Sequence, residues 1–158
     1  MVNKSNNAFF FTLEAESTTL QERYGNLINK ALNTLQSEII MENKKISFKI
    51  CGSLEAKKIN KEFRKKDQPT NVLAFPTDDD IFSLPNHLGD ILICDELVIK
   101  EAVSLGIDFD ERFTHLVIHG ILHLLGYLHN TESNAYMMET LESKIMSKLG
   151  YSDPYLKC

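Results

Sequence analysis

Hydrophobic residues recur along the chain at two different spacings, one typical of strands and one typical of helices. Ile46, Phe48 and Ile50 alternate with polar residues, which predicts a strand with one exposed face. Short apolar runs predict three further strands, at Phe9–Leu13, Asn71–Phe75 and Gly89–Ile93. We therefore expect about four short strands.

Apolar residues at helical spacing predict about five helices. Thr19 followed by Glu22 has the spacing of a capping box for the start of the first helix. The predicted helices cover roughly residues 19–39, 54–65, 95–105, 108–126 and 131–149. This order of elements indicates an α+β fold, in which a small, mixed and mostly parallel sheet packs with the helices. No linker divides the chain, so we expect a single domain over residues 1–158.

Composition narrows the class of protein to an ordinary globular one. The 158 residues are 43% hydrophobic and 25% charged, which excludes disordered and collagen-like chains. The three cysteines form no Cys-x-x-Cys pair, which fits a reducing compartment. No apolar run approaches the roughly 18 residues of a membrane span, and the first residues lack the core of a signal peptide. We therefore expect a cytoplasmic protein with no membrane partner.

Charge is distributed unevenly along the chain. The net charge is −5, yet residues 43–66 carry nine basic residues and two acidic ones. On the predicted helix at 54–65, Ala56, Ile59 and Phe63 share one side, which is expected to face the core. The opposite side is a basic stripe formed by Lys57, Lys58, Lys61, Arg64 and Lys65. Such a stripe is typical either of a solvated helix face or of a surface that binds nucleic-acid phosphates.

Four of the five histidines lie within 15 residues, on and just after the predicted helix at 108–126. His119 and His123 are one helical turn apart, so both imidazoles can bind one metal ion. Gly126 permits the chain to turn and brings His129 toward them. Three imidazoles with one open position are the ligand set of a catalytic zinc site, at the spacing found in metzincin proteases. The pattern predicts a zincin-like metal helix that binds one zinc ion per chain. Nickel or another divalent metal is the alternative, because nickel also accepts imidazole ligands.

Three further candidate residues leave alternatives open. His115 lies two turns before His123, too far along the helix to share its metal, so we expect it to support a metal ligand, contact a phosphate or be a core histidine. Asp90 could orient a ligand histidine, act as a base or form a turn. Gly120 stands where H-E-x-x-H peptidases carry their general base, which disfavours a peptidase and predicts close approach of another segment or of substrate.

Residues 119–129, His-Gly-Ile-Leu-His-Leu-Leu-Gly-Tyr-Leu-His, resemble the signature H-G-x-L-H-L-x-G-Y-D-H of the bacterial YbeY family of endoribonucleases. Residues 60–76 resemble the family's N-x-x-[YF]-R-x-K-D-x-P-T-[DN]-V-L-S-F-P, residues 88–91 its L-G-D-I, and residues 149–155 its L-G-Y-x-D-P-Y tail. The resemblance covers about residues 50–155, roughly two thirds of the chain.

This resemblance implies a zinc-dependent endoribonuclease, specific for single-stranded RNA, that acts in 16S rRNA 3′ end maturation and ribosome quality control. The zinc ligands it implies are His119, His123 and His129. Arg64 and His119 are implied as the catalytic residues. The residues then expected to bind RNA are Lys57, Lys61, Arg64 and Lys65. Implied partners are rRNA, the small ribosomal subunit, ribosome assembly factors and a ribosomal protein.

Two positions depart from the family pattern. Leu128 replaces the Asp beside the third histidine, and Ala74 replaces a Ser in the V-L-S-F-P strand. Two other function classes use the same candidate residues. One is a metal-dependent peptidase or amidase, and the other is a ribosome assembly factor whose zinc is structural.

Overall fold

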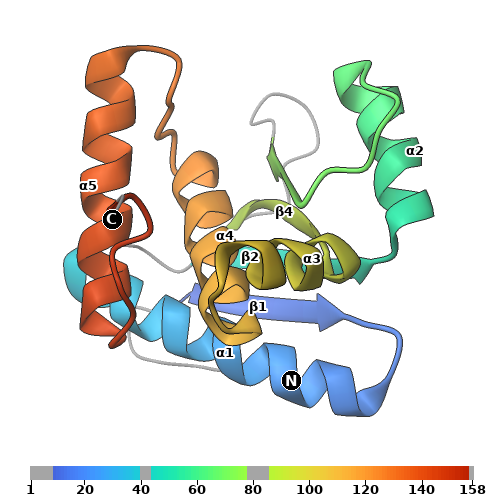
Figure 1. Ribbon diagram of the computed structural model, residues 1–158, viewed down its shortest axis with the longest axis horizontal. Coiled ribbons are helices and arrows are strands. Elements are labelled where there is room, and N and C mark those ends of the chain that lie inside the picture. Colours follow the sequence, from blue (N-terminus) through green and yellow to red (C-terminus); the bar gives the residue numbers. More distant parts are fainter. Residues whose placement is uncertain (1–8, 40–43, 78–85, 157–158) are drawn as a thin grey trace.

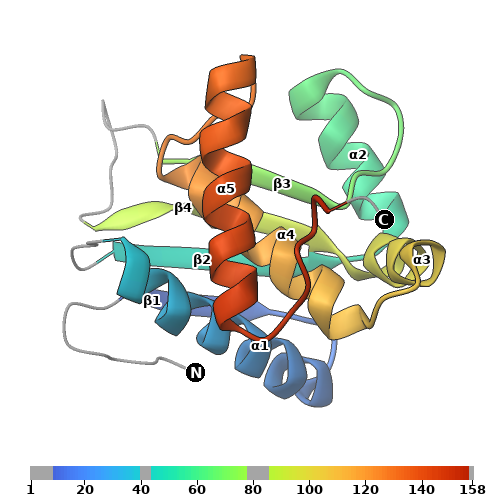
Figure 2. The same cartoon turned by 60° about the vertical axis from the view of Figure 1, so that its left-hand side comes forward.

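The computed structural model describes residues 9–39, 44–77 and 86–156. Within these residues the strands form one sheet in the order β1-β2-β4-β3 (Figures 1 and 2). Its strands are β1 (Phe9–Glu14), β2 (Lys44–Cys51), β3 (Val72–Pro76) and β4 (His87–Cys94). β1, β2 and β4 run parallel, whereas β3 pairs antiparallel with β4. The predicted mixed, mostly parallel sheet is confirmed.

Five helices are present in the described part of the chain. They are α1 (Thr18–Glu38), α2 (Ser53–Arg64), α3 (Asp95–Leu105), α4 (Phe109–Leu124) and α5 (Glu132–Lys148). Among them, none combines the length and the apolar character that crossing a membrane requires. The five helices together with the mixed sheet confirm the α+β fold class expected from the sequence.

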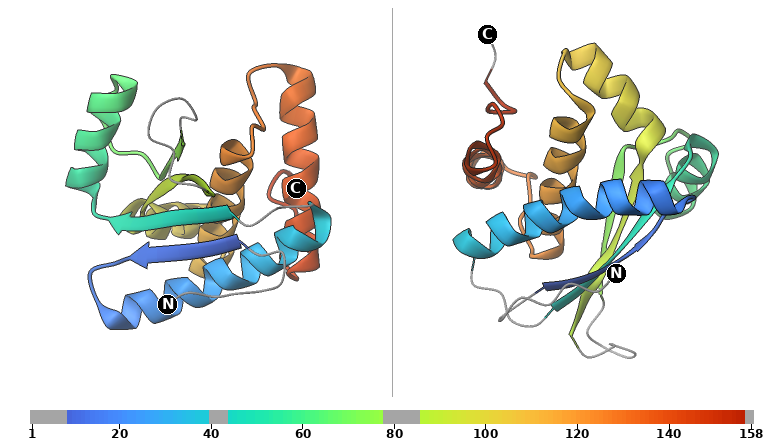
Figure 3. Two further views of the ribbon diagram at one scale, coloured as in Figure 1. Left: turned by 180° about the vertical axis from the view of Figure 1, so that it is seen from behind. Right: turned by 90° about the horizontal axis from the view of Figure 1, so that it is seen from below.

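The two faces of the sheet bury different helices, because successive side chains of a strand point to opposite faces. Ile91 and Ile93 of β4 lie in the main core, together with apolar side chains from α1, α4 and α5. Leu92 and Cys94 alternate with them and pack with Ala56 of α2 in a second, smaller cluster. The sheet therefore separates α2 from α4. Figure 3 shows that α5 lies beyond α4, farther from the sheet.

Two local expectations are wrong. The N-cap of α1 is Ser17, whose hydroxyl accepts a hydrogen bond from the Leu20 N–H at 3.2 Å, so the helix begins before the expected cap at Thr19. Phe63 was expected to face the core, but it is 61% exposed and meets Phe75 of β3 edge-on, with ring centroids 5.3 Å apart. Its position in the last turn of α2, near the end of the helix, carries it past the edge of the smaller core cluster.

Candidate metal centre

The position of α4 on the sheet is set at Gly120, the residue after His119. A Cβ atom added there would lie 3.2 Å from Cδ1 and 3.3 Å from Cγ2 of Ile91, and 3.5 Å from Cγ2 of Val72. The two contacts with Ile91 are tighter than ordinary carbon contacts of about 3.5–4.0 Å, whereas the contact with Val72 is an ordinary one. The expectation that Gly120 permits close approach of another segment is confirmed, and that segment is β4. Position 120, which carries the general base in H-E-x-x-H peptidases, therefore faces the core.

The end of α4 is a Schellman motif, which reverses the chain toward the preceding turn. Gly126 has φ +97°, and its N–H donates to the His123 carbonyl at 3.0 Å, while the Tyr127 N–H donates to the Leu122 carbonyl at 3.0 Å. His129 lies three residues beyond Gly126. The motif therefore provides the turn that the sequence predicted between the second and third histidines.

This turn brings His119, His123 and His129 together. Each offers one ring nitrogen, and these nitrogens all lie within 4.8 Å of one another. The Nε2 atoms of His119 and His123 are 3.0 Å apart. Tetrahedral zinc with bonds of about 2.0–2.1 Å separates its nitrogen ligands by roughly 3.3 Å, so the cluster fits a metal ion of that kind.

Hydrogen bonds fix which nitrogen of His123 faces this centre. Its Nδ1 lies 2.9 Å from the carbonyl oxygen of Tyr127, so Nδ1 must carry the proton and donate it. Nε2 then has a free lone pair directed at the other histidines. Burial, reinforced by the neighbouring His119, lowers the pKa of His123. Burial and the neighbouring His119 thus both favour the neutral imidazole that a metal needs as a ligand.

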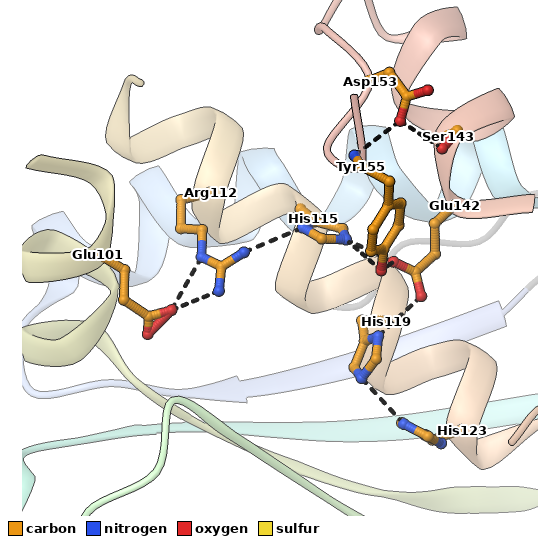
Figure 4. Close-up of polar contacts among 9 residues, drawn as sticks. All are labelled: Glu101, Arg112, His115, His119, His123, Glu142, Ser143, Asp153 and Tyr155. Carbon is orange, nitrogen blue, oxygen red and sulfur yellow. Dashed lines mark hydrogen bonds and ion pairs between the residues drawn. The ribbon is translucent and has the colours of Figure 1, made fainter. Parts of the chain in front are cut away.

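His119 is oriented in the same way by a carboxylate. Its Nδ1 lies 2.8 Å from Oε1 of Glu142, on α5, so Nδ1–H donates and Nε2 is left for a metal (Figure 4). While both rings are neutral, the Nε2 atoms of His119 and His123 face each other without a proton between them. A shared cation satisfies both lone pairs, which is a second sign that the donor set suits a metal.

Glu142 is fully buried and remains ionised. Burial alone would raise its pKa, but the hydrogen bonds from His115 and His119 outweigh that effect and lower the pKa to about 2. The Tyr155 hydroxyl also donates to Oε2. Burial raises the pKa of Tyr155, so this phenol keeps its proton. A buried carboxylate that accepts from a metal-ligating histidine is a common support for metal sites in proteins.

His115 lies outside the three-histidine cluster. Its Nε2 is 2.5 Å from Oε2 of Glu142, and its Nδ1 is 3.3 Å from Nη1 of Arg112 (Figure 4). Arg112 in turn donates to Glu101, from Nη2 at 2.5 Å and from Nε at 3.1 Å. Of the roles considered for His115, this geometry matches support of a metal ligand through Glu142.

The structure does not bring Asp90 to the cluster of His119, His123 and His129. Asp90 precedes Ile91, whose side chain packs against Gly120 of α4, so Asp90 points to the opposite face of β4. There it lines a pocket with Ile59 and Phe75 and lies 3.4 Å from Nε2 of His87. It is mostly exposed, so this position gives it no contact through which to orient a ligand histidine.

The basic stripe is exposed along α2, which Figure 1 shows on the opposite side of the molecule from α5. Arg64 is the last residue of the helix, and Lys65 follows it with φ +61°. Lys57 and Lys61 lie 3.9 and 4.0 Å from the carboxylate of Asp67. In Figure 1 the C-terminal ends of α2 and α4 point to the same side of the molecule. The stripe thus lies on one helix and His119 and His123 lie on another, and the C-terminal ends of the two helices share one side of the molecule.

Sequence reasoning missed three residues of the network around the histidines: Arg112, Glu142 and Tyr155. A signal for Glu142 was present. It follows Met138 by four residues and precedes Ile145 by three, so a charged residue occupies the buried stripe of a helix. Charged residues are almost never fully buried without a partner, and the histidines are the partners that this signal points to.

The chain is similar to a family of known proteins. The family model described as "Endoribonuclease YbeY" matches residues 11–150. A protein named Endoribonuclease YbeY from Buchnera aphidicola subsp. Baizongia pistaciae is 40% identical over 118 residues, which cover 75% of this chain and 77% of that protein. One of the same name from Ruthia magnifica subsp. Calyptogena magnifica is 41% identical over 139 residues, covering 88% of each. The solution structure of TM1509 from Thermotoga maritima is similar with a TM-score of 0.55 and 26% identity, covering 93% of this chain and 99% of that one.

Proposed function

Because the chain belongs to the YbeY family of endoribonucleases, we propose that it is a zinc-dependent hydrolase that cuts single-stranded RNA. The observation that carries the metal dependence is the cluster of His119, His123 and His129, whose ring nitrogens lie within 4.8 Å of one another. Glu142 and the Tyr127 carbonyl each hold a proton on the outer nitrogen of one ring. Two ligands are therefore already in the tautomer that binds a metal.

The chemistry divides between the metal and the basic stripe. Zinc, when bound, would supply Lewis acidity and activate water near the scissile phosphate. His119 and His123 would keep their lone pairs directed at it, held by their outer hydrogen bonds. The Arg64 guanidinium, exposed at the end of α2, would stabilise the extra negative charge that develops on the phosphate during cleavage. Lys57, Lys61 and Lys65 would bind neighbouring phosphates, so binding would weaken as salt rises.

The proposed substrate is ribosomal RNA, with the 3′ end of 16S rRNA as the site of maturation and a further role in ribosome quality control. The small ribosomal subunit, assembly factors and a ribosomal protein are the corresponding partners, and the cytoplasm is the corresponding compartment. Family membership is the ground for proposing them. The basic stripe supports an RNA partner, because contacts of lysine and arginine with phosphates provide a large share of nucleic-acid affinity.

A peptidase or amidase is disfavoured by the surroundings of Gly120. A Cβ atom added there would be crowded by Ile91, and a glutamate side chain would be directed at the apolar side chains of Ile91 and Val72. The position of the general base in an H-E-x-x-H site is therefore unsuited to a glutamate in this chain. An assembly factor with a structural zinc would use the same histidines. An RNA-cleavage assay distinguishes it from an endoribonuclease.

The direct test is cleavage of a single-stranded RNA fragment containing the 16S 3′ end by the zinc-loaded protein. We expect cleavage by the wild type, strong loss in His123→Ala, and loss in Arg64→Lys, because an ammonium cannot reproduce the planar donor set of a guanidinium. Arg23→Lys is the matched control, since Arg23 is an exposed arginine on α1 that pairs with Asp110. Unchanged cleavage by folded His123→Ala protein would contradict the proposal, and binding without cleavage by the wild type would favour the assembly factor.

The ends of the products identify the attacking group. A 2′,3′-cyclic phosphate would show attack by the ribose 2′-hydroxyl, and cleavage of RNA in which that hydroxyl is replaced by hydrogen would show attack by water. The same digestion therefore reports both the activity and its chemical class.

A further inference from the structure

The carboxylate of Glu142 is the point where three separate segments meet in the interior. Its exposed fraction is 0%, and its polar contacts among the described residues come from His115 and His119 on α4 and from Tyr155 in the C-terminal segment (Figure 4). A buried ion is costly unless it is well paired, and replacing such a group by an apolar side chain is often harmless to stability. A purely structural role therefore gives little reason for a glutamate here.

The direction of each hydrogen bond around Glu142 can be assigned. Arg112 has only donors, so it donates to Nδ1 of His115, and the proton of that neutral ring sits on Nε2 and points to Glu142. His119 donates from Nδ1, and Tyr155 donates its hydroxyl proton. The carboxylate accepts all three bonds, two of them on Oε2. The two bonds on Oε2 therefore fix the orientation of the carboxylate, and they leave Oε1 to accept from His119.

The C-terminal segment is itself anchored, so Tyr155 is held against the carboxylate. Asp153 accepts from the Tyr155 N–H at 2.9 Å and from the Ser143 hydroxyl at 2.7 Å, which ties the turn to α5 one residue after Glu142. The ring of Tyr155 packs edge-on against His115, with centroids 5.6 Å apart. The segment after α5 therefore completes the enclosure of Glu142.

We propose that Glu142 and Tyr155 are positioning residues of the metal centre, which hold His119 with its Nδ1 protonated and its Nε2 directed at the metal. This inference rests on the metal dependence in the proposed function. Tyr155 acts through Glu142, and Glu142 acts through His119. The C-terminal segment, far from the histidine motif in sequence, is on this account part of the machinery that binds the metal.

The test is the zinc dissociation constant, measured by competition with a chromophoric chelator, for Glu142→Gln and Tyr155→Phe. Glu142→Gln replaces one acceptor oxygen by an NH2 group, and we expect zinc binding about 10- to 100-fold weaker, the usual effect of losing such a partner. Tyr155→Phe removes one donor and keeps the ring, and it acts only through Glu142, so we expect a smaller loss of roughly 3- to 10-fold, below the range for the direct partner. Tyr136→Phe and Glu132→Gln are matched controls on exposed positions of α5 and should bind zinc like the wild type.

Two further readouts separate positioning from a general loss of structure. Thermal unfolding of the zinc-free proteins should show that Tyr155→Phe is folded, which keeps the proposal testable if Glu142→Gln does not fold. The visible spectrum of the cobalt-substituted protein should change in Glu142→Gln, because the geometry at His119 changes. Zinc affinity within twofold of wild type in folded variants would overturn the inference. If the variants bind zinc more weakly, as expected, but the wild type does not cleave RNA, the proposed activity would be overturned and this inference would stand.

Discussion

The substitution Gly120→Ala would place a methyl group between α4 and the sheet. In the native packing that methyl carbon would lie 3.2 and 3.3 Å from two carbons of Ile91 and 3.5 Å from one carbon of Val72. Ile91 is 1% exposed, so it has little room to move away. The helix must therefore shift by a few tenths of an ångström, and it carries His119 with it.

Two effects of opposite sign set the magnitude. Alanine is favoured over glycine inside a helix by about 1 kcal/mol. Overpacking a well-filled core costs about 1–3 kcal/mol. The expected result for Gly120→Ala is a net loss of about 1 kcal/mol in the free energy of unfolding, because the steric cost exceeds the gain in helix propensity.

Gly25 in α1 provides a matched control, since it is another buried glycine inside a helix. A Cβ atom there would meet only Leu13 Cδ2, at 3.9 Å, which is an ordinary contact. Gly25→Ala should therefore keep the gain of about 1 kcal/mol without the steric cost. The two variants should differ by about 2 kcal/mol, which corresponds to roughly 4–8 °C in Tm for a chain of this size.

The assay is urea and thermal unfolding of both zinc-free variants beside the wild type, read by circular dichroism. Equal m-values would show that the unfolded states are comparable. If Gly120→Ala were as stable as Gly25→Ala, the close approach of α4 to β4 would not limit the residue at position 120. The account of why a glycine follows His119 would then be refuted.

Three further predictions concern stability. Gly89→Ala should destabilise the protein by about 3 kcal/mol in urea unfolding, because its Cβ would lie 2.5 Å from the Phe75 carbonyl oxygen; wild-type stability would contradict that contact. The low pKa of Glu142 means that the unfolded chain binds more protons between about pH 4.5 and 2, so stability falls as pH falls through this window. The loss in the zinc-free wild type should exceed that in Glu142→Gln by about 3 kcal/mol, and parallel pH profiles would rule this out. Thr131→Ala should cost about 1 kcal/mol, seen as a lower Tm, because its hydroxyl caps α5 by accepting from the Asn134 N–H at 3.1 Å; an unchanged Tm would show that the cap contributes nothing.

The metal-binding motif could be predicted because its geometry is local. His119 and His123 are one helical turn apart, and Gly126 supplies the turn to His129, so short-range rules place all three side chains. The period of apolar residues likewise predicted the helices, and the order of strands and helices along the chain predicted a mixed, mostly parallel sheet. Strand order was not predicted, because it depends on which strand edges meet after long crossovers.

The supporting network could not be placed by such rules. Glu142 lies 23 residues after His119, and their contact depends on how α5 packs on α4. For Asp90 the sequence left three roles open, and it is the observed strand alternation that places its side chain on the face of β4 away from α4. Phe63 follows the helical period, yet the core ends before the last turn of α2 reaches it.

The central claim is that the three histidines hold a metal that RNA cleavage requires. The most direct measurement is cleavage of one single-stranded RNA by the same preparation after chelation and again after zinc is restored, at constant magnesium, with the metal content determined in each state. The account predicts that cleavage disappears in the metal-free protein and returns on addition of one zinc ion per chain. Equal cleavage by metal-free protein would contradict it.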